Sequence, residues 1–160
     1  MPEEQSLDDY QAAFKKLNRL VLARDRSIAE SRQRLVSDGF SEMVIDKVIA
    51  RACECEILDD QRFIRAYVSG KQHLGWGIRK IEAGLKKHEI RLQLQPGYPD
   101  SHYNAEDELN RALKCLTSSR SKAKDQRSAQ FRRLLAKGFS ADIAQKAISQ
   151  LTLVEQGDTI

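Results

Sequence analysis

A short pattern that returns along the chain limits what this sequence can fold into. Arg34-Leu35 and Gly39-Phe40-Ser41 reappear 99 positions later as Arg133-Leu134 and Gly138-Phe139-Ser140. In each copy the Gly suits a left-handed helix C-cap, the Phe its hydrophobic contact, and the Ser the N-cap of the next helix. Apolar residues spaced three to four apart surround both copies, as on helices buried along one side. The pattern predicts an array of helical units that share core with their neighbours.

The repeat divides the 160 residues into five ranges. We expect an acidic N-terminal tail over 1–9, a first three-helix unit over 10–57, a middle unit over 58–103, a third three-helix unit over 104–151 and a C-terminal tail over 152–160. The predicted fold class is all-α, a tandem repeat of three small three-helix units forming an elongated, curved array. The middle unit departs from the pattern because Glu89 stands where Gly is expected. Pro96, Gly97 and Pro99 also forbid a continuous third helix there, so 91–103 is either a short helix or a loop.

Local signals place helices within these ranges. The first helix is expected near 10–24, and Ser27 with Glu30 forms a capping box that opens the second. Ile28, Leu35 and Val36 are expected to face inward from that second helix. In the middle unit, Asp59 and Asp60 open a helix that ends near Gly70 to Gly75. Gly75-Trp76-Gly77 then makes a tight corner, since Gly tolerates positive φ, and a basic helix follows with Ile78, Ile81 and Leu85 inward.

Positive charge is concentrated in three windows, although the net charge is only +4. The windows are 15–34, 62–91 and 111–137, and acidic stretches separate them. One such window is usually a solvated helix face. Three windows at regular intervals favour an anionic partner.

Several classes of protein are disfavoured by the sequence. No apolar run approaches the roughly 20 residues that span a bilayer, and the acidic N-terminus lacks a signal pattern, so we expect a cytoplasmic protein with no membrane contact. Three cysteines are too few for a disulfide framework. Cys53-x-Cys55 lacks the spacing of a zinc site, and Asp59-Asp60 is explained by helix capping rather than by Mg²⁺. We expect no enzyme activity, no catalytic residue, no metal and no cofactor.

Five stretches occur in the order found in a known family. They are R-D-R-S-I-A-E at 24–30, G-F-S at 39–41, L-D-D-Q-R-F at 58–63, G-W-G-I-R-K-I at 75–81 and F-R-R-L-L-A-K-G-F-S at 131–140. Over roughly 13–151 the chain resembles the RecX recombination regulators. The resemblance implies a protein that binds the RecA recombinase and its filament on single-stranded DNA. It also implies inhibition of the ATPase, coprotease and strand-exchange activities of RecA, without catalysis by the regulator.

The expected partners are therefore RecA and the RecA–single-stranded DNA filament, with weak direct DNA binding, and the chain is expected to be a monomer. The candidate contact residues are basic, with one tryptophan: Arg24, Arg26, Arg32, Arg34, Arg62, Arg65, Lys71, Trp76, Arg79, Lys80, Lys86, Lys87, Arg132, Arg133 and Lys137. Trp76 either packs between units or stacks on a base or in a partner's pocket. The alternative function is a small helical DNA-binding protein or transcriptional regulator with a helix-turn-helix.

Overall fold

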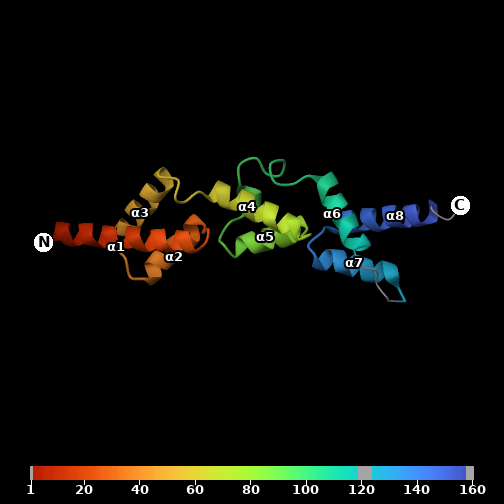
Figure 1. Cartoon of the computed structure of the whole chain (residues 1–160), viewed down its shortest axis with the longest axis horizontal. Coiled ribbons are helices and arrows are strands. Elements are labelled where there is room, and N and C mark those ends of the chain that lie inside the picture. The colour runs from red at the N-terminus through yellow and green to blue at the C-terminus, as the bar shows by residue number, and fades with distance from the viewer. Residues whose placement is uncertain (1, 119–123, 158–160) are drawn as a thin grey trace. The chain divides into compact units, whose positions relative to one another are not determined.

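The computed structural model describes residues 2–118 and 124–157. This part of the chain forms eight α-helices and one 3₁₀ helix, without a strand (Figure 1). The helices are α1 (Pro2–Ala23), α2 (Ile28–Ser37), α3 (Glu42–Glu54), α4 (Asp60–His73), α5 (Ile78–Lys86), η1 (Leu92–Leu94), α6 (Ala105–Thr117), α7 (Gln126–Ala136) and α8 (Ala141–Gly157). The all-α class is confirmed, whereas the division into three three-helix units stays a prediction.

Contacts along the chain define two compact bodies. The N-terminal body comprises Met1–Arg65 with Lys87–Ile90, and the C-terminal body comprises Ala66–Lys86 with Arg91–Ile160. The division falls within α4 and at the end of α5. The two bodies are described separately below.

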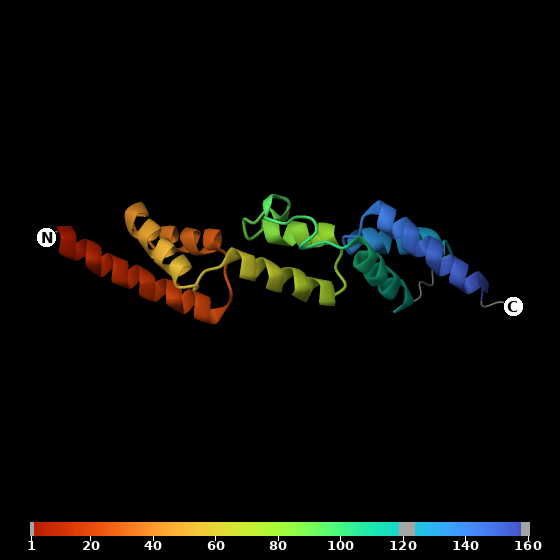
Figure 2. The same ribbon diagram turned by 90° about the horizontal axis from the view of Figure 1, so that it is seen from above.

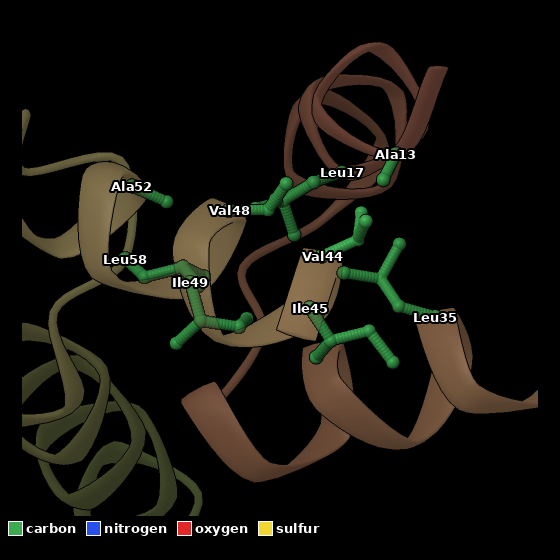
Figure 3. Close-up of a cluster of buried hydrophobic side chains, with 9 residues drawn as sticks. All are labelled: Ala13, Leu17, Leu35, Val44, Ile45, Val48, Ile49, Ala52 and Leu58. Carbon is green, nitrogen blue, oxygen red and sulfur yellow. The ribbon is translucent and has the colours of Figure 1, made fainter. Parts of the chain in front are cut away.

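The N-terminal body has its core among α1, α2 and α3, which lie together in both views (Figures 1 and 2). Figure 3 shows the side chains that meet there: Ala13, Leu17, Leu35, Val44, Ile45, Val48, Ile49, Ala52 and Leu58. The predicted caps hold this arrangement. Ser27 and Glu30 make both hydrogen bonds of the capping box, and Ser41 caps α3. Val36 was expected to face inward, but its side chain is 50% exposed, because the stripe of α2 is centred on Leu35.

Most of each expected terminal tail is helical in the structure. The expected tail over 1–9 is helical from Pro2, because Pro is accepted at the first helical position and no Gly or Pro interrupts the following 21 residues of α1. The expected tail over 152–160 is helical as far as Gly157, and the Thr152 hydroxyl donates to the Ile148 carbonyl at 2.9 Å. Residues 158–160 of that tail lie outside the described residues.

The C-terminal body has its larger core among α6, α7 and α8, again side by side in both views (Figures 1 and 2). Phe139 and Leu134 are fully buried there, at the second copy of the sequence repeat. The segment 91–103, left open by the sequence, contains the single 3₁₀ turn η1 and otherwise irregular backbone. Leu92 anchors it by burial, and the Tyr98 hydroxyl donates to Glu82 Oε1 at 2.9 Å.

Candidate functional site

The corner between α4 and α5 presents the single tryptophan of the chain. The helix α4 closes with hydrogen bonds from the Gly75 N–H to the Gln72 carbonyl at 2.9 Å and from the Trp76 N–H to the Lys71 carbonyl at 3.1 Å. This is a Schellman motif, in which Gly75 adopts φ +76°. The Trp76 ring is only partly buried. Nζ of Lys71 lies 4.6 Å from its centroid and Nζ of Lys80 lies 4.3 Å from it, both within cation–π range.

A backbone contact fixes the other side of this corner. The Gly77 N–H donates to the Lys137 carbonyl at 2.9 Å, and the Arg79 N–H donates to the Gly138 carbonyl at 3.1 Å. A Cβ on Gly77 would lie 2.4 Å from the Gly138 backbone. The expected reason for Gly77 was a positive φ, and this is wrong, since within the 75–77 corner the backbone is left-handed at Gly75 only. Gly77 is required because two backbones meet there without room for a side chain.

Glu108 ties α6 to the start of α5. Its side chain is 1% exposed, and its Oε1 accepts from the Ile78 N–H at 2.8 Å while its Oε2 accepts from Arg111 at 2.7 Å. Burial raises the pKa of Glu108, and the hydrogen bond from Ile78 and the charge of Arg111 oppose that rise. Sequence reasoning missed this residue. The available signal was its spacing on α6, four residues before Ala112 and eight before Leu116, which are both buried.

Basic side chains from three helices line an open pocket of about 480 Å³ in the C-terminal body. The pocket is called the basic pocket below, and its lining is Gln72, His73, Leu74, Gly75, Arg111, Lys114, Cys115, Ser118, Arg133 and Lys137. None of these residues is acidic. The structure thus brings the candidates Arg133 and Lys137 together with two cations that were not singled out, Arg111 and Lys114. Their sign and helical spacing were visible in the sequence, but the convergence of α4, α6 and α7 was not.

Arg132 and Arg133 are neighbours in sequence but lie at different sites. Arg132 lines a second pocket with Arg127 and Phe131, whereas Arg133 lines the basic pocket. Successive helical residues point about 100° apart, so a pair of adjacent arginines cannot serve one pocket equally. Arg120 and Lys122, which belong to the same basic window, lie outside the described residues.

Five candidate arginines of the N-terminal body are engaged within that body. Arg24 pairs with Glu30 at 2.9 Å, Arg32 pairs with Asp46, and Arg34 lies 3.7 Å from Asp38. Two others donate to backbone carbonyls: Arg26 to Leu20 at 3.2 Å, and Arg62 to Glu56 at 2.9 Å. These side chains therefore have a structural use, which weakens the case for all of them as partner contacts.

The remaining candidates are Arg65, Arg79, Lys86 and Lys87. All four are exposed. Arg79 and Lys86 lie on α5, whose inward residues Ile81 and Leu85 are fully buried. The expected separation of an apolar inner face from a basic outer face is therefore confirmed at these four positions of α5, whereas Ile78 and Lys80 are both half-buried.

Glu30 joins three partners at the start of α2. Burial on its own raises the pKa of Glu30, but hydrogen bonds from Arg24, the Ser27 N–H and His88 lower it to about 2. The Ser27 hydroxyl in turn donates to the His88 carbonyl at 2.9 Å. The cluster attaches the segment Lys87–Ile90 to α2 within the N-terminal body.

Asp59 caps its own helix α4, as expected, whereas Asp60 caps the start of α2 instead. Asp59 Oδ1 accepts from the Arg62 N–H at 3.1 Å in its own helix, and Asp60 Oδ1 accepts from the Ile28 N–H of α2 at 2.9 Å. Cys53, Cys55 and Cys115 are free thiols. Across the described ranges, no group of three His, Cys, Asp or Glu side chains is placed to hold a metal ion.

Comparisons with known proteins agree on one group. No protein-family model matches the chain. The regulatory protein RecX of Prosthecochloris aestuarii is 28% identical over 136 residues, which cover 80% of this chain and 85% of the relative. That of Legionella pneumophila is 26% identical, covering 87% of this chain and 94% of the relative. Against RecX of Leuconostoc mesenteroides the identity is 27%, and the alignment spans about half of that longer protein, 52%.

Two crystal structures have the same fold. RecX from Lactobacillus salivarius superposes with a TM-score of 0.75 at 19% identity, covering 92% of this chain and 99% of that one. A second structure, of a regulatory protein RecX, gives a TM-score of 0.68 at 14% identity and covers 91% of this chain and 74% of the other.

Proposed function

This chain belongs to the RecX family of regulatory proteins, and on that premise we propose that it regulates homologous recombination by binding the RecA recombinase. The proposed partners are RecA itself and its filament on single-stranded DNA. Binding lowers the ATPase, coprotease and strand-exchange activities of RecA. The observation that carries the proposal is the similarity to named RecX proteins over four fifths or more of the chain.

The chemistry of the surface supports an anionic partner of this kind. A nucleoprotein filament carries phosphate charge along its whole length, and basic side chains on a binding protein release the counterions of that phosphate. Exposed cations occur on α5 and around the basic pocket. Arg side chains can bind carboxylate or phosphate through two parallel hydrogen bonds, so the same surface suits acidic patches of the recombinase.

In this proposal the protein acts by occupying sites on RecA and its filament, and not by catalysing a reaction. As a regulator that binds, it requires no catalytic residue, metal or cofactor, and its place of action is the cytoplasm, as a monomer. Along 2–118 and 124–157, none of the helices combines the length and apolarity needed to cross a bilayer. Regulation then depends on how much of the filament is covered, so inhibition grows with the ratio of this protein to RecA.

We assign the filament contact to the outer face of the basic helix α5 and the residue that follows it. Arg79, Lys86 and Lys87 are exposed and flank the buried residues Ile81 and Leu85. Reversal of their charge should leave the fold unchanged, because exposed positions of this kind usually alter stability by less than about 0.5 kcal/mol each. Lys80 is left in place, because its ammonium group lies over Trp76.

Sedimentation of RecA filaments tests this assignment. The triple variant Arg79→Glu, Lys86→Glu and Lys87→Glu is expected to remain in the supernatant while wild type sediments with the filament. A control variant carries Lys15→Glu, Lys47→Glu and Arg127→Glu, which change the net charge equally at exposed positions elsewhere. An equal loss of filament binding in both variants would mean that binding depends on net charge and not on the α5 residues. Normal sedimentation of the folded triple variant would place the interface on another surface.

A further inference from the structure

The basic pocket of the C-terminal body is built for an anion. Arg111 and Lys114 reach it from α6, and Arg133 and Lys137 reach it from α7 and the residue after it. Among the described residues, no carboxylate lines it. The buried carboxylate of Glu108 is already occupied by Arg111 and by the Ile78 N–H. The pocket therefore concentrates positive charge, and its described lining contributes no negative charge.

Three of the cationic side chains of this pocket carry donors without an acceptor among the described residues. Nε of Arg111 is buried and has no hydrogen-bond partner among the described residues. Lys114 and Lys137 also lack a carboxylate within ion-pair distance over the part of the chain that the structure describes. The ammonium groups of Lys114 and Lys137 can therefore donate to an oxyanion that enters the open pocket.

The ring of Trp76 belongs to the residue that follows a lining residue of the basic pocket. Gly75 lines the basic pocket, and Trp76 is the next residue, so their Cα atoms are only about 3.8 Å apart. The ring is partly exposed and is contacted by the ammonium groups of Lys71 and Lys80. Both lysines are on flexible side chains, and stacking of a base on an exposed ring is stronger than an exposed cation–π pair. A base could therefore replace one ammonium group on the ring.

We propose that the basic pocket binds a phosphate group of a nucleotide whose base, or whose neighbour's base, stacks on Trp76. The combination of an acid-free cationic pocket with an indole on the residue that follows its lining residue Gly75 favours this ligand over an acidic peptide, which would use the cations and leave the ring without a matching group. The chemistry is shared by a free nucleotide and by one unit of a single-stranded nucleic acid. The proposal goes beyond regulation of RecA and is tested without RecA.

Trp76 is the only tryptophan, so its fluorescence reports directly on the site. The protein is titrated at one fixed salt concentration with a thymidine oligonucleotide, with ATP and with inorganic tripolyphosphate. Quenching of Trp76 by the oligonucleotide or ATP is expected, and tripolyphosphate should compete for the pocket with little quenching of its own. An affinity for the oligonucleotide at least tenfold above that for ATP identifies the single strand as the source. Comparable affinities identify the free nucleotide.

A matched pair of variants locates the binding. Lys114→Gln with Arg133→Gln removes two charges from the basic pocket, and Arg127→Gln with Arg132→Gln removes two charges from the other pocket. The first variant should bind at least tenfold more weakly, and the second should change affinity by less than twofold. Circular dichroism verifies that both double variants are folded. If Lys114→Gln with Arg133→Gln does not fold, the single variant Lys114→Gln replaces it and is expected to weaken binding at least threefold.

Three results would overturn the proposal. The first is the absence of quenching by the oligonucleotide and by ATP. The second is equal weakening by the two double variants, which would show attraction to net charge only. The third is binding of poly-glutamate as tight as that of the oligonucleotide and equally sensitive to Lys114→Gln with Arg133→Gln, which would assign the pocket to an acidic protein. None of these results bears on inhibition of RecA, which is measured separately.

Discussion

Gly39 and Gly138 have the same backbone conformation but different surroundings. Their φ angles are +89° and +93°, and each precedes the Phe of the repeated pattern. A Cβ on Gly39 would meet nothing within 4 Å, whereas a Cβ on Gly138 would lie 2.3 Å from Lys80 Cβ and 2.5 Å from Lys80 N. At Gly39, glycine is therefore favoured by the left-handed backbone alone. At Gly138, it is favoured both by the left-handed backbone and by the close contact with Lys80.

Alanine at the two positions separates these effects. Gly39→Ala should lower the free energy of unfolding by about 1 kcal/mol, from left-handed strain. Gly138→Ala should cost about 2 kcal/mol or more, since the backbones of α5 and the α7–α8 turn must also move apart. Urea denaturation followed by circular dichroism measures both. Equal losses would mean that the contact with Lys80 yields without cost.

Glu30 gives the N-terminal body a pH-dependent contribution to stability. Its pKa in the folded protein is about 2, against 4.5 without the fold. Because the folded pKa is the lower one, the contribution is fully present above about pH 4.5 and is lost as the pH falls from 4.5 towards 2. Glu30→Gln should therefore reduce stability by about 1–2 kcal/mol at neutral pH and by progressively less below pH 4.5.

Denaturation of wild type and Glu30→Gln across pH 2–7 measures this difference. Asp46→Asn is the control, because Asp46 is 60% exposed in its pair with Arg32 and should contribute less than about 0.5 kcal/mol at any pH. A Glu30→Gln difference that stays constant from pH 7 to pH 2 would refute the cause given for the lowered pKa.

Among the elements, α5 and α6 are joined by one buried carboxylate. Glu108→Gln retains an oxygen for the Ile78 N–H but removes the charge that pairs with Arg111. We expect a loss of about 2 kcal/mol in unfolding free energy, because a half-buried guanidinium is left without its charged partner. Glu106→Gln, exposed in the same first turn of α6, should cost less than about 0.5 kcal/mol. Similar losses for the two variants would show that the pairing is unimportant.

The end of α5 tests the predicted repeat. Glu89 takes the place of the repeated Gly and adopts φ +59°, the left-handed conformation of Gly39 and Gly138. Glu89→Gly should therefore raise the unfolding free energy by about 0.5–1 kcal/mol through relief of strain, even though a hydrogen bond from Gln33 is lost. Thermal melting followed by circular dichroism measures the change. A lower stability of the variant would mean that the Gln33 contact outweighs the strain.

Helices, caps and inward stripes were predictable because they depend on neighbours in sequence. The capping box at Ser27 and the inward residues Ile81 and Leu85 are confirmed. The reason for Gly77 and the role of Glu108 were not predictable, because each depends on a residue 30 or more positions away. The candidate site was predictable in part for the same reason. The sign of the charges was visible, but not the convergence of α4, α6 and α7 on one pocket.

At the scale of the whole molecule, charge is used differently in the two bodies. Candidate arginines of the N-terminal body are largely engaged in ion pairs and backbone contacts, whereas the C-terminal body keeps cations at an acid-free pocket. The three basic windows of the sequence do not distinguish the cations of the two bodies as candidate contacts, because composition does not show which charges are paired. The family assignment came from the ordered motifs, and the comparisons support it over most of the chain.

ATP hydrolysis by RecA on single-stranded DNA tests the central claim most directly. The rate is measured while the concentration of this protein is raised from far below to above that of RecA. We expect the rate of ATP hydrolysis to fall. If the protein covers the filament, inhibition requires nearly one molecule of it per RecA, and if it blocks filament ends, much lower ratios are sufficient. A rate that is unchanged over the whole range, with RecA active and this chain folded, would contradict the proposed function.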